Sequence, residues 1–350
     1  MRLSELHRIK LINLPTPLQE LPNLSEKLGG PRIFVKRDDL TGLAFGGNKG
    51  RKLEYIMADA VEAGADCVVT EAGFHSNWCT QTAAAALRLG MKVVLVKDGP
   101  RDGYDPKYYD GNHLLHSLMG AEMRVVRPEN RKETIDTVMD RLRAEGHSPY
   151  YALLGGSNAV GAAAYANCVL EILSQSVEMG VKMDYLIHSS GSGGTQAGLV
   201  AGAKALNTGM KIIGVNTGST PKAAQREKVS RILKSTLELL EIEQKVTDED
   251  IIVFDEYGGG GYGFMTEQKA EAVRLPAETE GLFLDPVYTA TAMAGLIDLC
   301  RKGYFSQEDN VVFLHTGGTA ALFPYKAPLR AYLEQKAMPW KVPEWSPKAA

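Results

Sequence analysis

The chain has 350 residues, more than one hydrophobic core usually organises, so two domains are expected. With 44% hydrophobic and 23% charged residues it is typical of a globular protein, and its formal net charge of −3 argues against nucleic acid or an anionic membrane as partner. No apolar stretch is long enough for a signal-peptide core or a membrane span, and four separated cysteines without a CxxC pair favour a reducing cytoplasm.

Short apolar runs alternate with longer helical patterns along the chain. The runs predicted to be strands lie at 32–36, 66–70, 92–96, 123–126, 185–189, 211–215 and 311–315. Helical patterns between several of them lie at 76–89, 131–145, 194–206 and 289–302. This alternation predicts βα units, an α/β fold with mostly parallel sheets, and ligand binding at the carboxyl ends of the strands.

The segment AFGGNKGRKLEY, residues 44–55, places Lys49 behind a glycine pair where a helical pattern begins. A lysine in a first helical turn is unfavourably placed because that end of a helix carries partial positive charge. Arg51 and Lys52 add two further cations to the same turn. The turn is therefore either a solvated basic surface or a site that gathers anions and lowers the pKa of one lysine.

A second candidate site is the loop SGSGGT, residues 190–195, which follows an apolar strand and precedes a helix of small residues. Its backbone N–H groups and the helix N-terminus can cradle a phosphate, although a plain strand-to-helix turn would have the same sequence. Nucleotide sites fit poorly, because Gln196 stands where the dinucleotide fingerprint has its third glycine, and Lys211 where its acid is expected. A phosphate cradle together with a lysine of lowered pKa suggests pyridoxal 5′-phosphate (PLP). The histidines lack metal-ligand spacing, so no metal site is expected.

Six motifs in order then resemble one family. They are GLAFGGNKGRKLEY, HSNWCTQTAAAALRLGMK, GSGGTQAG, YGGGGYG, LDPVYTATAM and LHTGG, and the resemblance runs from about residue 10 to 335. The chain resembles the 1-aminocyclopropane-1-carboxylate (ACC) deaminase and D-cysteine desulfhydrase family of the tryptophan synthase β superfamily. This resemblance implies a homodimer of PLP fold type II, with two domains that are each a mostly parallel open sheet flanked by helices. The implied larger domain comprises 1–48 and 160–337, the smaller 49–159, and 338–350 form a C-terminal tail.

The resemblance also implies roles for the motif residues. Lys49 matches the Schiff-base lysine and Lys52 the lysine that reaches the phosphate, while Arg51 has the alternative of being a surface or interface charge. The phosphate loop is matched by Gly191, Ser192, Gly193, Gly194 and Thr195.

Further matches surround the cofactor and the substrate. Asn77 matches the partner of the cofactor's phenolic oxygen, and Ser76 a residue that contacts the substrate carboxylate and shuttles a proton. Either side chain has the alternative of being a helix cap. Tyr262 and Tyr288 match two active-site tyrosines, with burial in a core as their alternative.

The expected substrate rests on two threonines. Ring-opening members of the family resemble one another in having Glu and Leu where this chain has Thr289 and Thr316. A hydroxyl near the pyridine nitrogen gives a milder electron sink than a carboxylate, which suffices when a good leaving group departs from the β-carbon. Thr316 is therefore expected to contact the cofactor and Thr289 the substrate.

The expected reaction is α,β-elimination of a small amino acid, best D-cysteine, to pyruvate, ammonia and sulfide. Lys49 would remove the α-proton, and Tyr288 or Tyr262 would assist the leaving group. His75 and Trp78 depart from the usual family residues and are expected near the substrate; a cationic His75 would suit L-cysteate, with sulfite as product. Three competing interpretations stay open: an ACC deaminase, an idle PLP-binding protein and a nucleotide-dependent oxidoreductase.

Overall fold

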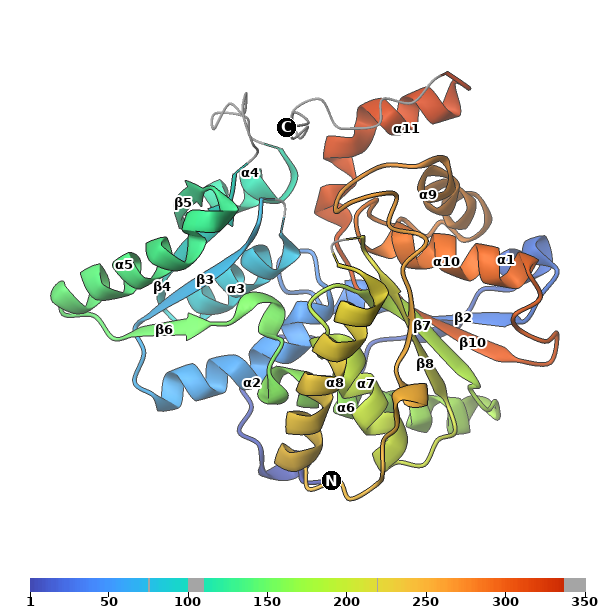
Figure 1. Ribbon diagram of the computed structural model, residues 1–350, viewed down its shortest axis with the longest axis horizontal. Helices are drawn as coiled ribbons and strands as arrows, with labels where there is room; N and C mark the ends of the chain where they lie inside the picture. The colour runs from blue at the N-terminus through green and yellow to red at the C-terminus, as the bar shows by residue number, and fades with distance from the viewer. Residues whose placement is uncertain (75, 100–109, 219, 337–350) are drawn as a thin grey trace.

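The computed structural model describes residues 1–74, 76–99, 110–218 and 220–336, which form two β-sheets, each flanked by helices (Figure 1). The helices are α1 (Pro22–Leu28), α2 (Asn48–Glu62), α3 (Asn77–Arg88), α4 (Gly111–Leu118), α5 (Arg131–Ala144), α6 (Ala159–Met179), α7 (Gly194–Ala205), α8 (Lys222–Leu239), α9 (Glu267–Glu280), α10 (Thr289–Arg301) and α11 (Lys326–Leu333). Within these described ranges, no helix combines the length and the apolar character needed to cross a membrane.

The larger sheet has six strands and is buried on both faces. Its order is β1 (Leu18–Glu20), β2 (Arg32–Lys36), β10 (Asn310–Leu314), β7 (Tyr185–Ser190), β8 (Lys211–Asn216) and β9 (Ile252–Phe254), with only β1 antiparallel to its neighbour. Alternate residues of β2 serve the two faces: Phe34 packs with α6, α7 and α8, whereas Ile33 and Val35 pack with α1, α9 and α10. Burial on both sides explains why these strands are apolar runs in the sequence.

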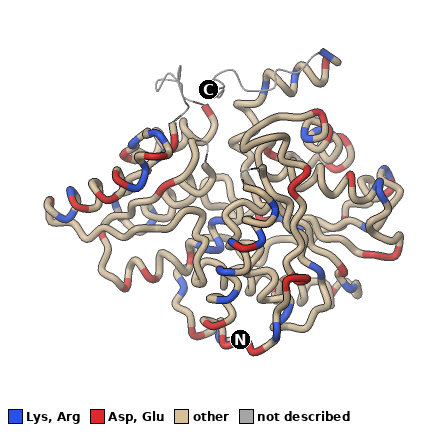
Figure 2. The backbone as a smooth tube through the Cα atoms, viewed as in Figure 1, with Lys and Arg blue, Asp and Glu red and all other residues tan. Residues whose placement is uncertain are grey.

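The smaller sheet has four parallel strands, in the order β5 (Glu122–Val126), β4 (Lys92–Asp98), β3 (Cys67–Gly73) and β6 (Pro149–Ala152). Helices α2 and α3 cover one face, where Val68 and Leu95 are buried, and α5 covers the other, where Val69 and Val94 are buried. The outer surface of α5 carries lysines and arginines interspersed with acids (Figure 2).

The α/β fold with two mostly parallel sheets is confirmed, as are all seven predicted strands and the helices at 76–89, 131–145, 194–206 and 289–302. The prediction omits β1, β6 and β9. Each has only three or four residues, too few to establish an alternating pattern.

The division into domains stays a prediction. All strands of the smaller sheet fall within 49–159, and those of the larger sheet fall outside that range. The expected tail, 338–350, lies outside the described residues.

Candidate active site

A cavity of about 380 Å³ lies at the carboxyl ends of strands from both sheets, where ligands of parallel sheets are expected. Gly73, Asp98 and Ser190 are the last residues of β3, β4 and β7, and Thr316 follows β10. The cavity brings together most of the residues singled out from the sequence: Lys49, Ser76, Asn77, Trp78, Gly191, Ser192, Gly193, Thr195, Tyr262, Tyr288 and Thr316. Lys52, Gly194 and Thr289 do not line it, and His75 lies outside the described residues.

The glycine pair before Lys49 is required by close packing. Gly46 has φ 77° and Gly47 φ 134°, values that favour glycine, and a Cβ on Gly46 would lie 1.9 Å from the Asp39 carbonyl oxygen. Gln81 of α3 clamps this turn, since its Nε2 donates to the Gly46 carbonyl (2.9 Å) and its Oε1 accepts from the Gly50 N–H (2.6 Å). These contacts hold the start of α2 against α3, and the Asn48 N–H donates to the Thr316 carbonyl just after β10 (3.0 Å).

Lys49 lines the cavity, and its Nζ donates to Asn48 Oδ1 at 2.8 Å. Burial lowers its pKa to about 8, and the negative charge of Asp285 opposes this shift. The lowered pKa agrees with the prediction, but its cause is burial and not the crowding of cations. Burial, and then the charge of Lys49, also hold the pKa of Lys52 well below its usual value.

Arg51 is not a surface or interface charge, because it is only 2% exposed. Its guanidinium forms a bidentate pair with Asp38 (2.8 and 2.9 Å) and a further bond to Glu171 of α6 (2.9 Å). Tyr165 also donates to Asp38, at 2.7 Å. Arg51 therefore fixes α2 to the larger sheet and to α6 through a buried polar network.

The glycine-rich loop between β7 and α7 forms a second wall. Gly193 has φ 89°, and its neighbours Gly191, Ser192 and Thr195 line the cavity. A Cβ on Gly194 would lie 3.1 Å from Lys52 Nζ, so Lys52 Nζ sits directly behind the loop, where it donates to the Gly155 carbonyl at 2.9 Å. A loop N–H cradle with a buried amine beside it is chemically suited to a phosphate.

The N-terminus of α3 forms the opposite wall. Ser76 caps this helix, since its Oγ accepts from the N–H groups of Trp78 (3.1 Å) and Cys79 (3.3 Å), and it lines the cavity as well. Asn77 Oδ1 accepts from Asn112 Nδ2 at 2.7 Å. Trp78 is 2% exposed, packs in the core beside the smaller sheet and donates from its Nε1 to Thr70 Oγ1 at 2.7 Å, and it also lines the cavity.

Two tyrosines also line the cavity. The hydroxyls of Tyr262 and Tyr288 are hydrogen-bonded to each other, with ring centroids 5.7 Å apart. Burial raises the pKa of each phenol well above its usual value. Both side chains are therefore neutral near pH 7 and can hold a proton for transfer.

Thr289 is not exposed to the cavity. It is buried, and its Oγ1 donates to Asp285 Oδ1 at 2.7 Å and accepts from the Asp285 N–H at 2.7 Å. Thr316 does line the cavity, with its hydroxyl 3.3 Å from that of Ser189. Sequence reasoning missed Ser189 and Asp285, although the first ends the predicted strand 185–189 and the second belongs to the LDPVY motif.

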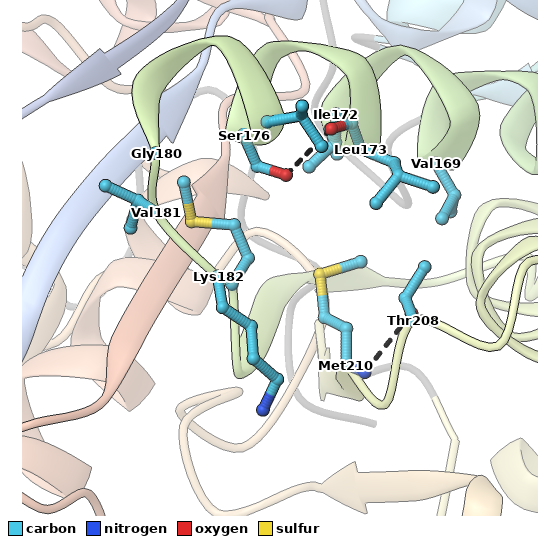
Figure 3. Close-up of a pocket in the computed structure, with 11 residues that line it drawn as sticks. Val169, Ile172, Leu173, Ser176, Gly180, Val181, Lys182, Thr208 and Met210 are labelled. Carbon is cyan, nitrogen blue, oxygen red and sulfur yellow. Dashed lines mark hydrogen bonds between the residues drawn. The ribbon is translucent and has the colours of Figure 1, made fainter.

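A second cavity, of about 320 Å³, lies beside the C-terminal part of α6 (Figure 3). Its walls are mainly apolar, and its hydroxyls are turned to the backbone: Ser176 donates to the Leu173 carbonyl and Thr208 accepts from the Met210 N–H. Lys182 at its edge pairs with Asp184 at 2.8 Å. No acid–base chemistry converges there among the described residues, in contrast to the cavity around Lys49.

Comparison with known proteins agrees with this geometry. Residues 9–317 match the family described as "Pyridoxal-phosphate dependent enzyme". A D-cysteine desulfhydrase of Klebsiella pneumoniae is 42% identical over 92% of this chain and 97% of its own. A putative ACC deaminase of Pyrococcus abyssi is 40% identical over 92% and 95%, and an ACC deaminase of Bradyrhizobium sp. is 38% identical over 93% and 98%.

Solved structures show the same fold. The crystal structure of an ACC deaminase homologue has a TM-score of 0.86 and 37% identity, covering 94% of this chain and 97% of that one. A threonine deaminase of Solanum lycopersicum has a TM-score of 0.61 at 16% identity, covering 91% of this chain and 81% of that one, a likeness of fold alone.

The chain therefore belongs to the pyridoxal-phosphate dependent enzymes, with fold type II and PLP as cofactor. Within that class it is a lyase of the group that includes the proteins named D-cysteine desulfhydrase and ACC deaminase. The residues fit the cofactor. The loop before α7 presents Gly191, Ser192, Gly193 and Thr195 to the cavity, and Lys49 opens on the same cavity.

Proposed function

We propose that the protein catalyses α,β-elimination of a sulfur-containing amino acid, with D-cysteine as the preferred substrate and pyruvate, ammonia and sulfide as products. The observation that carries the proposal is the pair of hydroxyls, Ser189 and Thr316, at the ends of β7 and β10 in the cavity wall. The resemblance places a leucine at position 316 in ring-opening members. A D-cysteine desulfhydrase is also 42% identical to the chain.

In this proposal the bound cofactor supplies the electron sink for negative charge at the substrate α-carbon. Lys49 Nζ removes the α-proton, and a pKa of about 8 leaves about one lysine in ten neutral at pH 7. The N-terminus of α3, with Ser76 as its cap, receives the substrate carboxylate through backbone N–H groups and the helix dipole. Tyr288 or Tyr262 then donates a proton to the departing sulfur.

The remaining residues hold the cofactor. Lys52 and the loop Gly191–Thr195 receive the phosphate, and Asn77 Nδ2 donates to the phenolic oxygen. Thr316 contacts the ring through its hydroxyl. Thr289 acts through Asp285, to which its hydroxyl is bonded.

A second candidate reaction is the elimination of sulfite from L-cysteate. It is favoured by Lys228, a cation that lines the cavity and donates to the Gly191 carbonyl (3.3 Å) and to Gln225 (3.1 Å). An ammonium in this position can meet an anionic side group. The expected contribution of His75 stays a prediction, as does that of Trp78.

One experiment separates these activities. The protein is assayed with D-cysteine, L-cysteate, D-serine and ACC side by side, and sulfide, sulfite and the keto acid are measured for each. Highest kcat/KM on D-cysteine with sulfide release supports the proposal. Efficient ring opening of ACC refutes it, and a preference for L-cysteate establishes the second candidate instead.

We also propose that the protein is a cytoplasmic homodimer and that each chain divides into the two domains given above. Light scattering of the purified protein tests the dimer. Limited proteolysis between β6 and α6, near Gly155 and Gly156, tests the boundary at 159/160.

A further inference from the structure

A chain of buried polar side chains leads from Asn77 into the smaller sheet. Asn112 Nδ2 donates to Asn77 Oδ1 (2.7 Å), and Asn112 Oδ1 accepts from Thr80 Oγ1 (2.8 Å). Thr80 Oγ1 also lies 2.8 Å from His116 Nε2, and His116 Nδ1 lies 3.0 Å from Lys97 Nζ. The four residues beyond Asn77 are each at most 2% exposed.

Lys97 ends this chain in a setting unusual for a lysine. Its Nζ contacts ring nitrogens of two histidines, His113 (2.8 Å) and His116, and lies 4.1 Å from the ring centroid of Phe74. No carboxylate among the described residues pairs with it. Burial lowers the pKa of Lys97 to about 7, and the charge of Cys79 opposes this shift.

The chemistry of a lysine ammonium fixes which atom donates and which accepts in each hydrogen bond of this series. In its ammonium form Lys97 Nζ can only donate, so each Nδ1 that faces it is an acceptor and each histidine carries its proton on Nε2. His116 Nε2–H then donates to Thr80, and Thr80 gives its single proton to Asn112 Oδ1 at 2.8 Å in preference to the more distant Ser76 carbonyl at 3.2 Å. Asn112 consequently presents Nδ2 to Asn77, so Asn77 Oδ1 points towards Asn112.

The other end of Asn77 is placed consistently with this order. A Cβ on Gly318 would lie 2.8 Å from Asn77 Nδ2 and 2.7 Å from Asp285 Oδ1, so the amide nitrogen is on the side of a carboxylate. An anionic oxygen can accept only from Nδ2 and not from Oδ1.

We propose that Lys97 is a positioning residue, which acts through His116, Thr80 and Asn112 to keep the Asn77 amide nitrogen directed at the cofactor's phenolic oxygen. This inference rests on the proposed role of Asn77. Without Lys97, His116 can take the Nδ1–H tautomer and accept the Thr80 proton. The bond that orients Asn112 is then lost, and both amides can turn over, which presents an oxygen to the anion.

The test uses Lys97→Met holoenzyme, with Lys92→Met as matched control. Lys92 is on the same strand and also contacts a histidine, His147 (2.8 Å), but on the surface. In wild type below pH 7, where Lys97 is an ammonium, ¹⁵N spectra are expected to show His116 with its proton on Nε2. In Lys97→Met we expect the Nδ1–H tautomer, a PLP dissociation constant at least about tenfold higher, and a shifted cofactor absorption band.

Thr80→Val is a second variant. It removes the hydroxyl that links His116 to Asn112 and changes the side-chain volume little. It should weaken PLP binding to a similar extent, and the double variant should be no worse than either single one, because both remove the same orientation. If Lys97→Met does not fold, Thr80→Val alone is expected to raise the PLP dissociation constant about tenfold while Lys92→Met leaves it unchanged.

An Nδ1–H tautomer of His116 in wild type below pH 7 overturns the inference. So do additive effects of the two changes, or a PLP dissociation constant in Thr80→Val within twofold of wild type. These readouts do not require turnover. Failure to eliminate sulfide from D-cysteine would refute the proposed substrate and leave the tautomer and PLP affinity measurements valid.

Discussion

Replacing Arg51 by leucine should destabilise the protein severely, although the residue has no direct role in the proposed chemistry. Its side chain is 1% exposed, and those of its partners Asp38 and Glu171 are 0% and 12% exposed. Removing one member of a buried ion pair leaves uncompensated charge in the interior and costs about 3–5 kcal/mol. We therefore expect the free energy of unfolding of Arg51→Leu to fall by that amount.

The matched control is Arg124→Leu, which removes an exposed pair with Glu122 (2.8 Å; Arg124 side chain 49% exposed). Such surface pairs contribute about 0–1 kcal/mol. Urea unfolding followed by circular dichroism compares the two variants on apoprotein, so that cofactor loss does not enter. Equal losses in the two variants would refute the view that Arg51 anchors α2.

The same network predicts a pH dependence. Burial tends to raise the pKa of Glu171, but the hydrogen bond and charge of Arg51, followed by those of Lys36, outweigh it and lower the pKa to about 2. A carboxyl whose pKa is lower in the folded state stabilises the fold above its usual pKa of 4.5, and this contribution is lost as the pH falls towards 2. Stability of Arg51→Leu should therefore depend less steeply on pH in this window than that of wild type.

Four further changes test the cavity. Apoprotein should bind PLP covalently at a rate that falls about tenfold per pH unit below pH 8, because only neutral Lys49 attacks the aldehyde; a flat rate between pH 6 and 8 contradicts this assignment. Lys49→Ala should retain PLP without the absorption of the lysine-bound form. Gly193→Val should weaken PLP binding, because φ is 89° and its Cβ would lie 3.3 Å from Ile232; unchanged cofactor content after dialysis would support a plain turn. Tyr288→Phe should lower kcat on D-cysteine about 10²-fold or more with PLP content unchanged; an unaltered kcat removes it as the proton donor. Thr316→Leu should reduce elimination, and further ring opening is expected only when Thr289→Glu is added; D-cysteine kcat/KM equal to wild type in Thr316→Leu would disprove the contact with the ring.

Much of the fold could be predicted because its strands are buried on both faces and their apolar runs are short and well separated. Most of the predicted site residues line one cavity, because the glycine-rich loops and Lys49 lie in compact motifs. Gly46 and Gly47 are an example. Close packing leaves no space for a side chain at either position, and the sequence shows this as two consecutive glycines.

The polar networks could not be predicted in this way. Arg51 and Glu171 are 120 residues apart, and Lys97 meets His113 and His116 from another element. Such partners are brought together only when α2 packs on α6 and when α4 lies against the end of β4. A charged residue in an amphipathic helix is usually solvated, so local sequence favoured an exposed Arg51.

The three cations of the first turn of α2 illustrate how the site is built. On a helix, residues 49, 51 and 52 point in different directions because successive side chains are separated by about 100°. Lys49 faces the cavity, Arg51 faces Asp38 and Glu171, and Lys52 lies behind the phosphate loop. Since two carboxylates compensate Arg51, its charge is not what depresses the Lys49 pKa, and burial does so instead. The turn thus anchors the helix with one cation and leaves two desolvated amines, Lys49 and Lys52, for the contacts with an aldehyde and a phosphate that we propose.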